Sequence, residues 1–189
     1  MNRSLEKFNR LVDALQELPT IGKKSATRLA YFMIMNDTYT GMKISHAIED
    51  AIGTLKKCKD CGGMSEDELC YICADERRDH TLLCIVENAK DILLLEENGL
   101  FDGRYFVLDS LEELSISHLE EIIEDGVREV LFALTPSIAN DAVILYIEDK
   151  LSEYNLNFTK IAQGVPTGVS LENIDLLSLT RALEDRVKV

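Results

Sequence analysis

Four cysteines in two closely spaced pairs are the residues of this chain with the plainest metal chemistry. Cys58 pairs with Cys61 and Cys70 pairs with Cys73, each as Cys-x-x-Cys, with eight residues between the pairs. Four thiolates make a closed tetrahedral sulfur site, which suits zinc and leaves no coordination position for water. The spacing therefore predicts one structural Zn²⁺ ion, and a redox dithiol or an iron–sulfur cluster is the alternative.

The compartment expected for the chain agrees with metal binding by these cysteines. The first residues are charged and amphipathic, with no apolar signal region. The longest uninterrupted apolar stretch, residues 29–35, is far too short to span a membrane. We therefore expect a cytoplasmic protein without a membrane partner, where reducing conditions disfavour disulfides. Cys84, alone in the apolar run 82–86, is expected to be a small buried hydrophobe.

A second group of residues could bind phosphate. Residues 18–28 place a short turn with Gly22 between two helical patterns, which is the layout of a helix-hairpin-helix. Such a hairpin offers backbone N–H groups and a helix N-terminus to a phosphate, whatever the base sequence. Lys23, Lys24 and Arg28 add positive charge beside it. The stretch predicts a DNA-binding hairpin, and the alternative is an ordinary helical hairpin with solvated lysines.

Glu87 is a third candidate, because it directly follows the apolar strand pattern of residues 82–86. A carboxylate at that end of a strand occupies the edge where open α/β sheets bind ligands. A magnesium site would need more acidic residues after a neighbouring strand. Asp109 is isolated, and the stretch 135–141 has no Asp-x-Asp pair and carries Asp141 on a helical pattern. The residues therefore favour a structural or protein-contacting Glu87 over a metal ligand.

Hydrophobic periodicity indicates the elements that position these side chains. Apolar residues at helical spacing predict three N-terminal helices, near residues 4–18, 23–35 and 44–55. From residue 81, short apolar strands alternate with helices, which predicts a mostly parallel α/β sheet with helices on its faces. The strands are expected at residues 82–86, 105–108, 130–134 and 158–162, and the helices at 89–97, 117–124, 138–154 and 176–186.

Charge is distributed unevenly along the chain, whose net charge is −14. Residues 1–57 carry nine Lys/Arg and six Asp/Glu, whereas residues 81–189 carry eight and twenty-one. A mildly basic N-terminal module suits phosphate, and an acidic remainder suits a basic protein partner. The expected modules are a hairpin module at 1–57, a four-cysteine finger at 58–80, an α/β domain at 81–163 and a C-terminal helical segment at 164–189.

Several features occur in a fixed order along the chain: the hairpin stretch, the spacing of the four cysteines, and further motifs at residues 83–87, 103–108, 161–168 and 179–186. In this order they resemble the RecR family of bacterial recombination mediators. The resemblance covers essentially the whole chain. It implies that the α/β domain is a Toprim domain and that the C-terminal segment carries a Walker-B-like motif.

The resemblance also implies a function. Members of that family are non-enzymatic, DNA-binding mediators that assemble as homodimers or ring-like homotetramers. With RecO, and in some bacteria RecF, they help load RecA onto single-stranded DNA coated by single-strand-binding protein. On this resemblance Glu87 becomes a candidate for partner binding. The alternative from another class is a magnesium-dependent Toprim enzyme that acts on DNA.

The chain departs from the family pattern in three places. Thr20 stands in the hairpin where the family usually has glycine. Residues 109–111 lead almost directly into a helix, where the family commonly has a long glycine-rich loop. The family's Asn-Pro-Thr with a following Glu-Gly is replaced by Thr-Pro-Ser at 135–137 and Ala-Asn at 139–140, which disfavours magnesium binding further.

Overall fold

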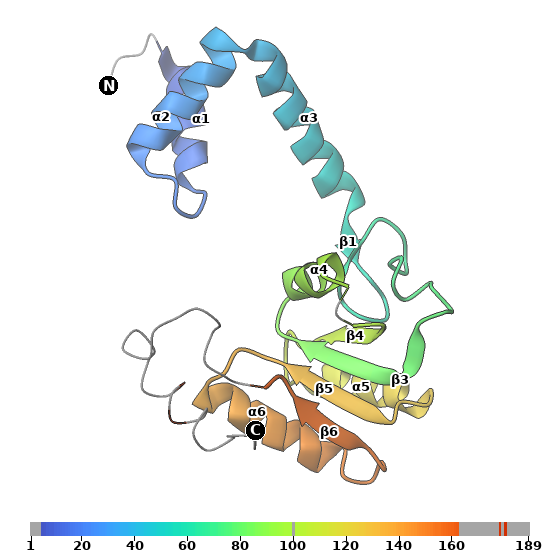
Figure 1. Ribbon diagram of the computed structural model, residues 1–189. Helices are drawn as coiled ribbons and strands as arrows, with labels where there is room; N and C mark the ends of the chain where they lie inside the picture. Colours follow the sequence, from blue (N-terminus) through green and yellow to red (C-terminus); the bar gives the residue numbers. More distant parts are fainter. Residues whose placement is uncertain (1–4, 100, 163–177, 179, 181–189) are drawn as a thin grey trace, which may run out of the picture. The chain divides into compact units, whose positions relative to one another are not determined.

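The chain folds into two compact units, Met1–Leu55 and Lys56–Val189, drawn in Figure 1. The computed structural model describes residues 5–99, 101–162, 178 and 180. The first unit is helical, whereas the second contains the cysteines and a four-stranded sheet. None of the helices in the described ranges is long and apolar enough to cross a membrane.

The hairpin of the first unit is formed by α1 (Glu6–Gln16) and α2 (Lys23–Tyr31), which pack against each other. Val12 of α1 and two alanines of α2, Ala26 and Ala30, are buried between them. The alanines lie four residues apart on one helix face, so their small side chains allow the helices to approach closely. The hydrophobic residues packed around this core are Phe8, Leu11, Leu15 and Ile21.

The rest of the first unit differs from the predicted helices. A π-helical turn, η2 (Phe32–Asn36), replaces the end of the helix expected to reach residue 35. The next helix, α3 (Thr38–Thr54), begins six residues earlier than expected. Its start is explained by Asp37, whose carboxylate accepts hydrogen bonds from the Thr40 amide at 3.0 Å and the Thr40 hydroxyl at 2.7 Å.

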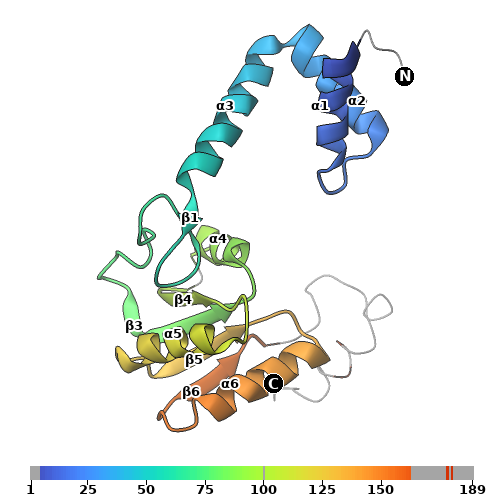
Figure 2. The same cartoon turned by 180° about the vertical axis from the view of Figure 1, so that it is seen from behind.

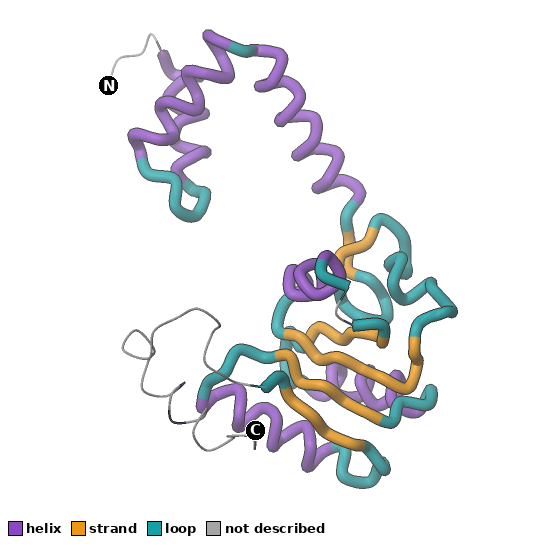
Figure 3. Tube along the Cα trace, viewed as in Figure 1, coloured by secondary structure: helices purple, strands orange, loops and turns teal. Residues whose placement is uncertain are grey.

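The second unit is built around a parallel sheet (Figure 3), with the strand order β4-β3-β5-β6. Parallel neighbours joined by helices form the arrangement that the alternating strand and helix patterns predict. A separate two-stranded antiparallel ribbon pairs β1 (Lys56–Lys57) with β2 (Met64–Ser65). The strands of the main sheet are β3 (Asp79–Val86), β4 (Gly103–Val107), β5 (Glu129–Ala133) and β6 (Asn157–Lys160).

Both faces of the sheet are covered. Successive residues of β3 point to opposite faces, so Leu83 and Ile85 pack with α5 and α6, whereas Cys84 and Val86 pack with α4 and the cysteines. Figure 2 shows α5 and α6 lying together on one side of the strands. The bounds of these helices are α4 (Ala89–Glu97), α5 (Glu113–Glu124) and α6 (Ile138–Lys150).

The observed bounds confirm the predicted order of elements and shift several ends. The helix at 89–97 has the predicted bounds, whereas α6 ends at Lys150 where residue 154 was expected. Beyond α6, turns take over, and the Tyr154 amide donates to the Leu151 carbonyl at 3.0 Å. The helix predicted at 176–186 and the Walker-B-like segment lie outside the described residues, apart from Ser178 and Thr180.

Candidate zinc site and nucleic-acid interface

The four predicted ligands come together in the second unit. The Sγ atoms of Cys58, Cys61, Cys70 and Cys73 all lie within 4.8 Å of one another. Three of the cysteines are buried and Cys73 is half-buried. This is the only group of three or more metal-binding side chains that the described part of the chain brings together. The cluster offers four sulfur ligands and no water position, which fits tetrahedral Zn²⁺.

Backbone amides complete the surroundings of these sulfurs. The Gly63 amide donates to Cys61 Sγ at 3.3 Å, and the Cys70 amide donates to Cys58 Sγ at 3.2 Å. The hydrogen bonds among the thiols lower the pKa of Cys70 and raise the pKa of Cys61 and of Cys73, so in the absence of metal one thiolate is shared within the cluster. Amide donors aimed at sulfur stabilise thiolates, the form that binds metal.

The finger is joined to the sheet through the loop between Cys58 and Cys61. The Val107 amide, at the end of β4, donates to the Cys61 carbonyl at 2.8 Å. On α5, His118 Nε2 lies 2.8 Å from the Asp60 carbonyl. The cysteines also share a hydrophobic cluster with Ile92 of α4 and with Tyr105 and other residues of the sheet. The metal site is therefore part of the core of this unit and not an appended loop.

In the first unit, the hairpin turn has the features of a type II turn. The Ile21 amide donates to the Leu18 carbonyl at 3.2 Å, with Pro19 and Thr20 between them. Thr20 has φ 68°, and it is the only non-glycine residue with positive φ among those described. A type II turn favours proline at its second position and glycine at its third. Thr20 therefore occupies the turn position that glycine fits best.

The predicted phosphate-binding residues lie together at the start of α2. Gly22 is the residue before the helix, and the space where a Cβ would stand is open, so the first amides of α2 are accessible. Lys23, Lys24 and Arg28 line an open hollow of about 620 Å³ on this helix. The amides at a helix N-terminus attract anions, and the cations strengthen that attraction.

Two further residues line the same hollow and were missed in the sequence: Thr27 and Tyr31. The Thr27 hydroxyl donates to the Lys23 carbonyl at 2.9 Å. The Tyr31 side chain remains 54% exposed. The sequence does contain a signal for Tyr31: Lys24, Arg28 and Tyr31 follow one another at intervals of four and three residues, so they share a helix face.

Glu87 directly follows β3, and its carboxylate accepts hydrogen bonds from Thr135, after β5, and from Asn140, on α6. It accepts a hydrogen bond from the Thr135 amide at 2.9 Å and another from the Thr135 hydroxyl at 3.1 Å. The side-chain amide of Asn140 also donates to Glu87, and it donates to the Thr135 carbonyl at 2.7 Å. The other isolated candidate, Asp109, forms an ion pair with Lys57. By its contacts with Thr135 and Asn140, Glu87 ties the loop after β5 to the end of β3.

Comparisons with known proteins agree with the geometry. Two models of the RecR family match the chain, one describing its helix-hairpin-helix at residues 8–52 and one describing its four-cysteine zinc finger domain at residues 55–75. A protein named recombination protein RecR from Nitratiruptor is 55% identical over the full length of both chains. Proteins of the same name from Campylobacter jejuni subsp. doylei and Helicobacter pylori (strain Shi470) are 53% and 49% identical, over 100% and 98% of this chain and 100% and 96% of theirs. The zinc-finger match and the four converging sulfurs confirm one structural zinc ion.

Proposed function

Because this chain belongs to the RecR family and is thus a protein of DNA recombination and repair, we propose that it is a DNA-binding recombination mediator. The observation that carries the proposal is that Lys23, Lys24 and Arg28 line one open surface of α2, which begins at the exposed N-terminus of the helix. With Gly22 leaving the backbone accessible, a phosphate meets helix amides and three cations at once.

The second unit supplies the proposed partner surface. Residues 81–189 carry eight basic and twenty-one acidic side chains, so their field attracts a basic protein and repels DNA phosphates. We assign RecO, and RecF where present, to this acidic part, which in this proposal is a Toprim domain. Glu87 is proposed as a residue of that surface, because it is half-exposed and fixes the loop between β5 and α6.

The proposed activity is mediation without catalysis: the protein helps load RecA onto single-stranded DNA coated by single-strand-binding protein, in the cytoplasm. Mediation without catalysis is consistent with the contacts of Glu87, whose carboxylate holds the loop between β5 and α6 through Thr135 and Asn140. Among the described residues, the hydrogen-bond partners of Glu87 are neutral donors, whereas a magnesium site would need further carboxylates.

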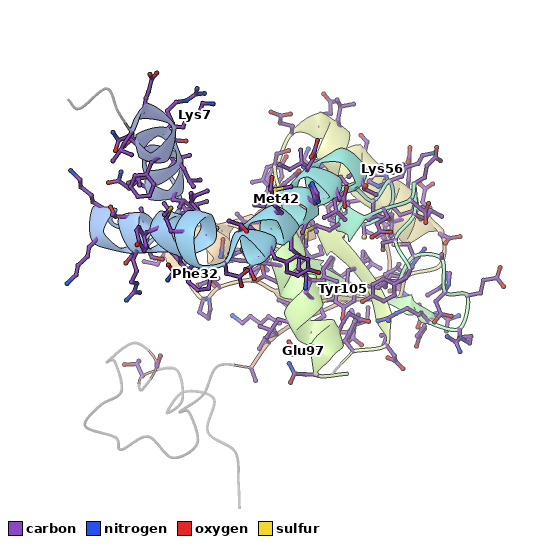
Figure 4. The ribbon with its side chains drawn as sticks, turned by 90° about the horizontal axis from the view of Figure 1, so that it is seen from above. Lys7, Phe32, Met42, Lys56, Glu97 and Tyr105 are labelled. Carbon is purple, nitrogen blue, oxygen red and sulfur yellow. The ribbon has the colours of Figure 1, made fainter. Side chains whose placement is uncertain are left out.

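A homodimer or homotetramer is the proposed assembly. No residue of α3 is buried, although the helix carries several large apolar side chains, among them Tyr39, Met42 (labelled in Figure 4), Ile48 and Ile52. Large apolar side chains exposed in this number on one helix mark an association surface in soluble proteins. Contacts between copies through α3 would cover them.

The DNA contact is tested by replacing Lys23, Lys24 and Arg28 with alanine together. Binding of a single-stranded oligonucleotide, followed by fluorescence anisotropy, is expected to weaken by at least about tenfold, because each lost phosphate contact removes a released counterion. The matched control removes the same charge from exposed positions of the same unit, and these are Lys7, Arg10 and Lys43. Equal losses in both variants would contradict the assignment of the DNA contact to the hairpin.

The partner contact is tested by capture of purified RecO with Glu87→Ala and Asn140→Ala. Both changes break the same hydrogen bond, but only the first removes a negative charge. Reduced capture with Glu87→Ala alone would mean that RecO recognises the carboxylate. Reduced capture with both would mean that it recognises the loop that Glu87 holds, and unaltered capture with both would remove Glu87 from the interface.

A further inference from the structure

The hollow runs along α2 from its first residue, Lys23, to its last, Tyr31, and so contains an aromatic ring in addition to its cations. The ring lies beside Lys24 and Arg28, and the surface of the hollow is mainly apolar. Phosphate alone needs charge and N–H donors, which the N-terminus of α2 already supplies. An apolar surface with an exposed ring offers something that a phosphate does not use.

The placement of Tyr31 follows from the helix geometry. Ala26 and Ala30 face α1 and are fully buried, so the core of this unit is complete without the ring of Tyr31. Tyr31 lies on the face of Lys24 and Arg28, one turn beyond Arg28. A strand whose phosphates contact these cations would therefore also contact the ring.

We propose that Tyr31 stacks on an unpaired base of single-stranded DNA while Lys24 and Arg28 hold the neighbouring phosphates. The inference rests on the proposed DNA contact of the hairpin and adds the substrate class. Proteins that bind single strands combine a positive groove with aromatic side chains on which bases stack, whatever the base. The bases of a duplex are already stacked on one another, so the ring favours single strands over duplexes.

The hollow is a shallow surface of α2 that is open to solvent, and its lining offers a ring and cations to a passing strand. The Thr27 hydroxyl donates its hydrogen bond to the Lys23 carbonyl within the helix, so this donor does not select one base over another. Stacking without hydrogen-bond readout is tolerant of sequence, as a mediator acting on any single strand requires.

The test compares the full-length protein with Tyr31→Leu, which removes the ring and keeps an apolar side chain, and with Tyr31→Phe, which keeps the ring. Three probes are used: a single-stranded oligonucleotide, the same backbone with abasic positions, and a duplex. Tyr31→Leu is expected to weaken binding of the normal single strand by about 5- to 100-fold. Binding of the abasic strand and the duplex is expected to stay within about twofold, because their phosphate contacts remain.

A direct signature accompanies the affinities. A strand containing 2-aminopurine is expected to lose fluorescence on binding the natural protein and Tyr31→Phe, because stacking quenches this base, and to keep it with Tyr31→Leu. Equal weakening on all three probes, or no weakening on any, would overturn the stacking role. A changed oligomeric state of Tyr31→Leu in light scattering would also overturn it, because the ring would then belong to an interface between copies.

The same three probes distinguish failure of the proposed phosphate contact of the hairpin from failure of the stacking by Tyr31. Lys24→Ala is expected to weaken binding of all three probes together, the abasic strand included. If Lys24→Ala changes nothing while Tyr31→Leu is selective for the normal strand, the phosphate assignment is wrong and the stacking stands. If the natural protein binds none of the probes, both proposals are wrong.

Discussion

Arg78 donates two hydrogen bonds to Glu96, from Nη1 to Oε2 at 2.9 Å and from Nη2 to Oε1 at 2.7 Å. The two side chains are only 13% and 15% exposed, so this ion pair is shielded from water. Tyr105 donates its hydroxyl to Glu96 at 2.8 Å, and the guanidinium lies 5.7 Å from the centre of its ring. The pair ties the chain that leaves the zinc finger to α4 and β4.

Replacing Arg78 with alanine is expected to destabilise the second unit by about 3–5 kcal/mol, because it leaves a shielded carboxylate without its cation. Urea unfolding followed by circular dichroism measures the change. Arg77 is the matched control: its side chain is 89% exposed and pairs with Asp75 at the surface. Arg77→Ala is expected to leave the stability nearly unchanged, because an exposed ion pair contributes little. Similar losses for the two arginines would contradict the structural role of Arg78.

The stability supplied by this pair is expected to depend on pH. Burial raises the pKa of Glu96, but the hydrogen bonds from Arg78 and Tyr105 and the charge of Arg78 outweigh it and leave the pKa below its ordinary value of 4.5. A carboxylate with a lowered pKa contributes stability above its unfolded pKa and loses it as the pH falls through the folded value. The stability gap between the natural protein and Arg78→Ala should therefore be full near neutral pH and shrink below about pH 4.5. A gap that widens on acidification would refute this origin.

Thr20→Gly is expected to stabilise the first unit. Thr20 has φ 68°, a conformation that is costly for a β-branched residue by about 1–2 kcal/mol. Glycine removes that cost but adds about 0.5–1 kcal/mol of unfolded-state entropy, which leaves a net gain of about 0.5–1 kcal/mol. Hydrogen exchange of the α1 and α2 amides measures it locally. Thr20→Ala, which keeps the unfavourable Cβ, serves as the control and should gain much less.

Loss of zinc is expected to loosen one face of the sheet. Cys73→Ser removes a ligand and should abolish stoichiometric zinc, and zinc binding of this kind contributes about 10 kcal/mol or more to folding. Since the finger shares its cluster with Ile92 and Tyr105, amide exchange in α4 and β4 should accelerate. The control is Cys84→Ala, at a buried cysteine outside the four-sulfur group, which should keep one zinc per chain. Retained zinc in Cys73→Ser would contradict the ligand set.

The features that depend on residues close together in the sequence, which are the zinc site and the parallel sheet, could be predicted from local patterns. The cysteine spacing predicted the zinc site, and apolar periodicity predicted the parallel sheet, because both signals lie within a few residues. The helix start at Thr38 lies six residues before the apolar pattern of residues 44–55, so apolar periodicity alone does not predict it. Asp37, which caps this helix, is the local signal for the start.

Long-range contacts could not be read from the chain. Glu87 was recognised as the residue after a strand, but its donors Thr135 and Asn140 lie 48 and 53 residues away. The pair of Arg78 with Glu96 likewise spans 18 residues. Thr135 reaches Glu87 because the pairing of β3 with β5 brings the ends of these two strands together, and Glu96 reaches Arg78 from helix α4. Ordinary charged residues give no sequence signal for such pairing.

The salt dependence of DNA binding tests the central claim, that the hairpin holds DNA by its phosphates. The affinity of the natural protein and of the triple alanine variant at Lys23, Lys24 and Arg28 is measured for one oligonucleotide over a series of salt concentrations. Each phosphate contact contributes about 0.7 to the slope of log affinity against log salt for a single strand, so the variant's slope should be shallower by about 2. Two parallel lines would contradict the claim, because the variant would then have lost no phosphate contact.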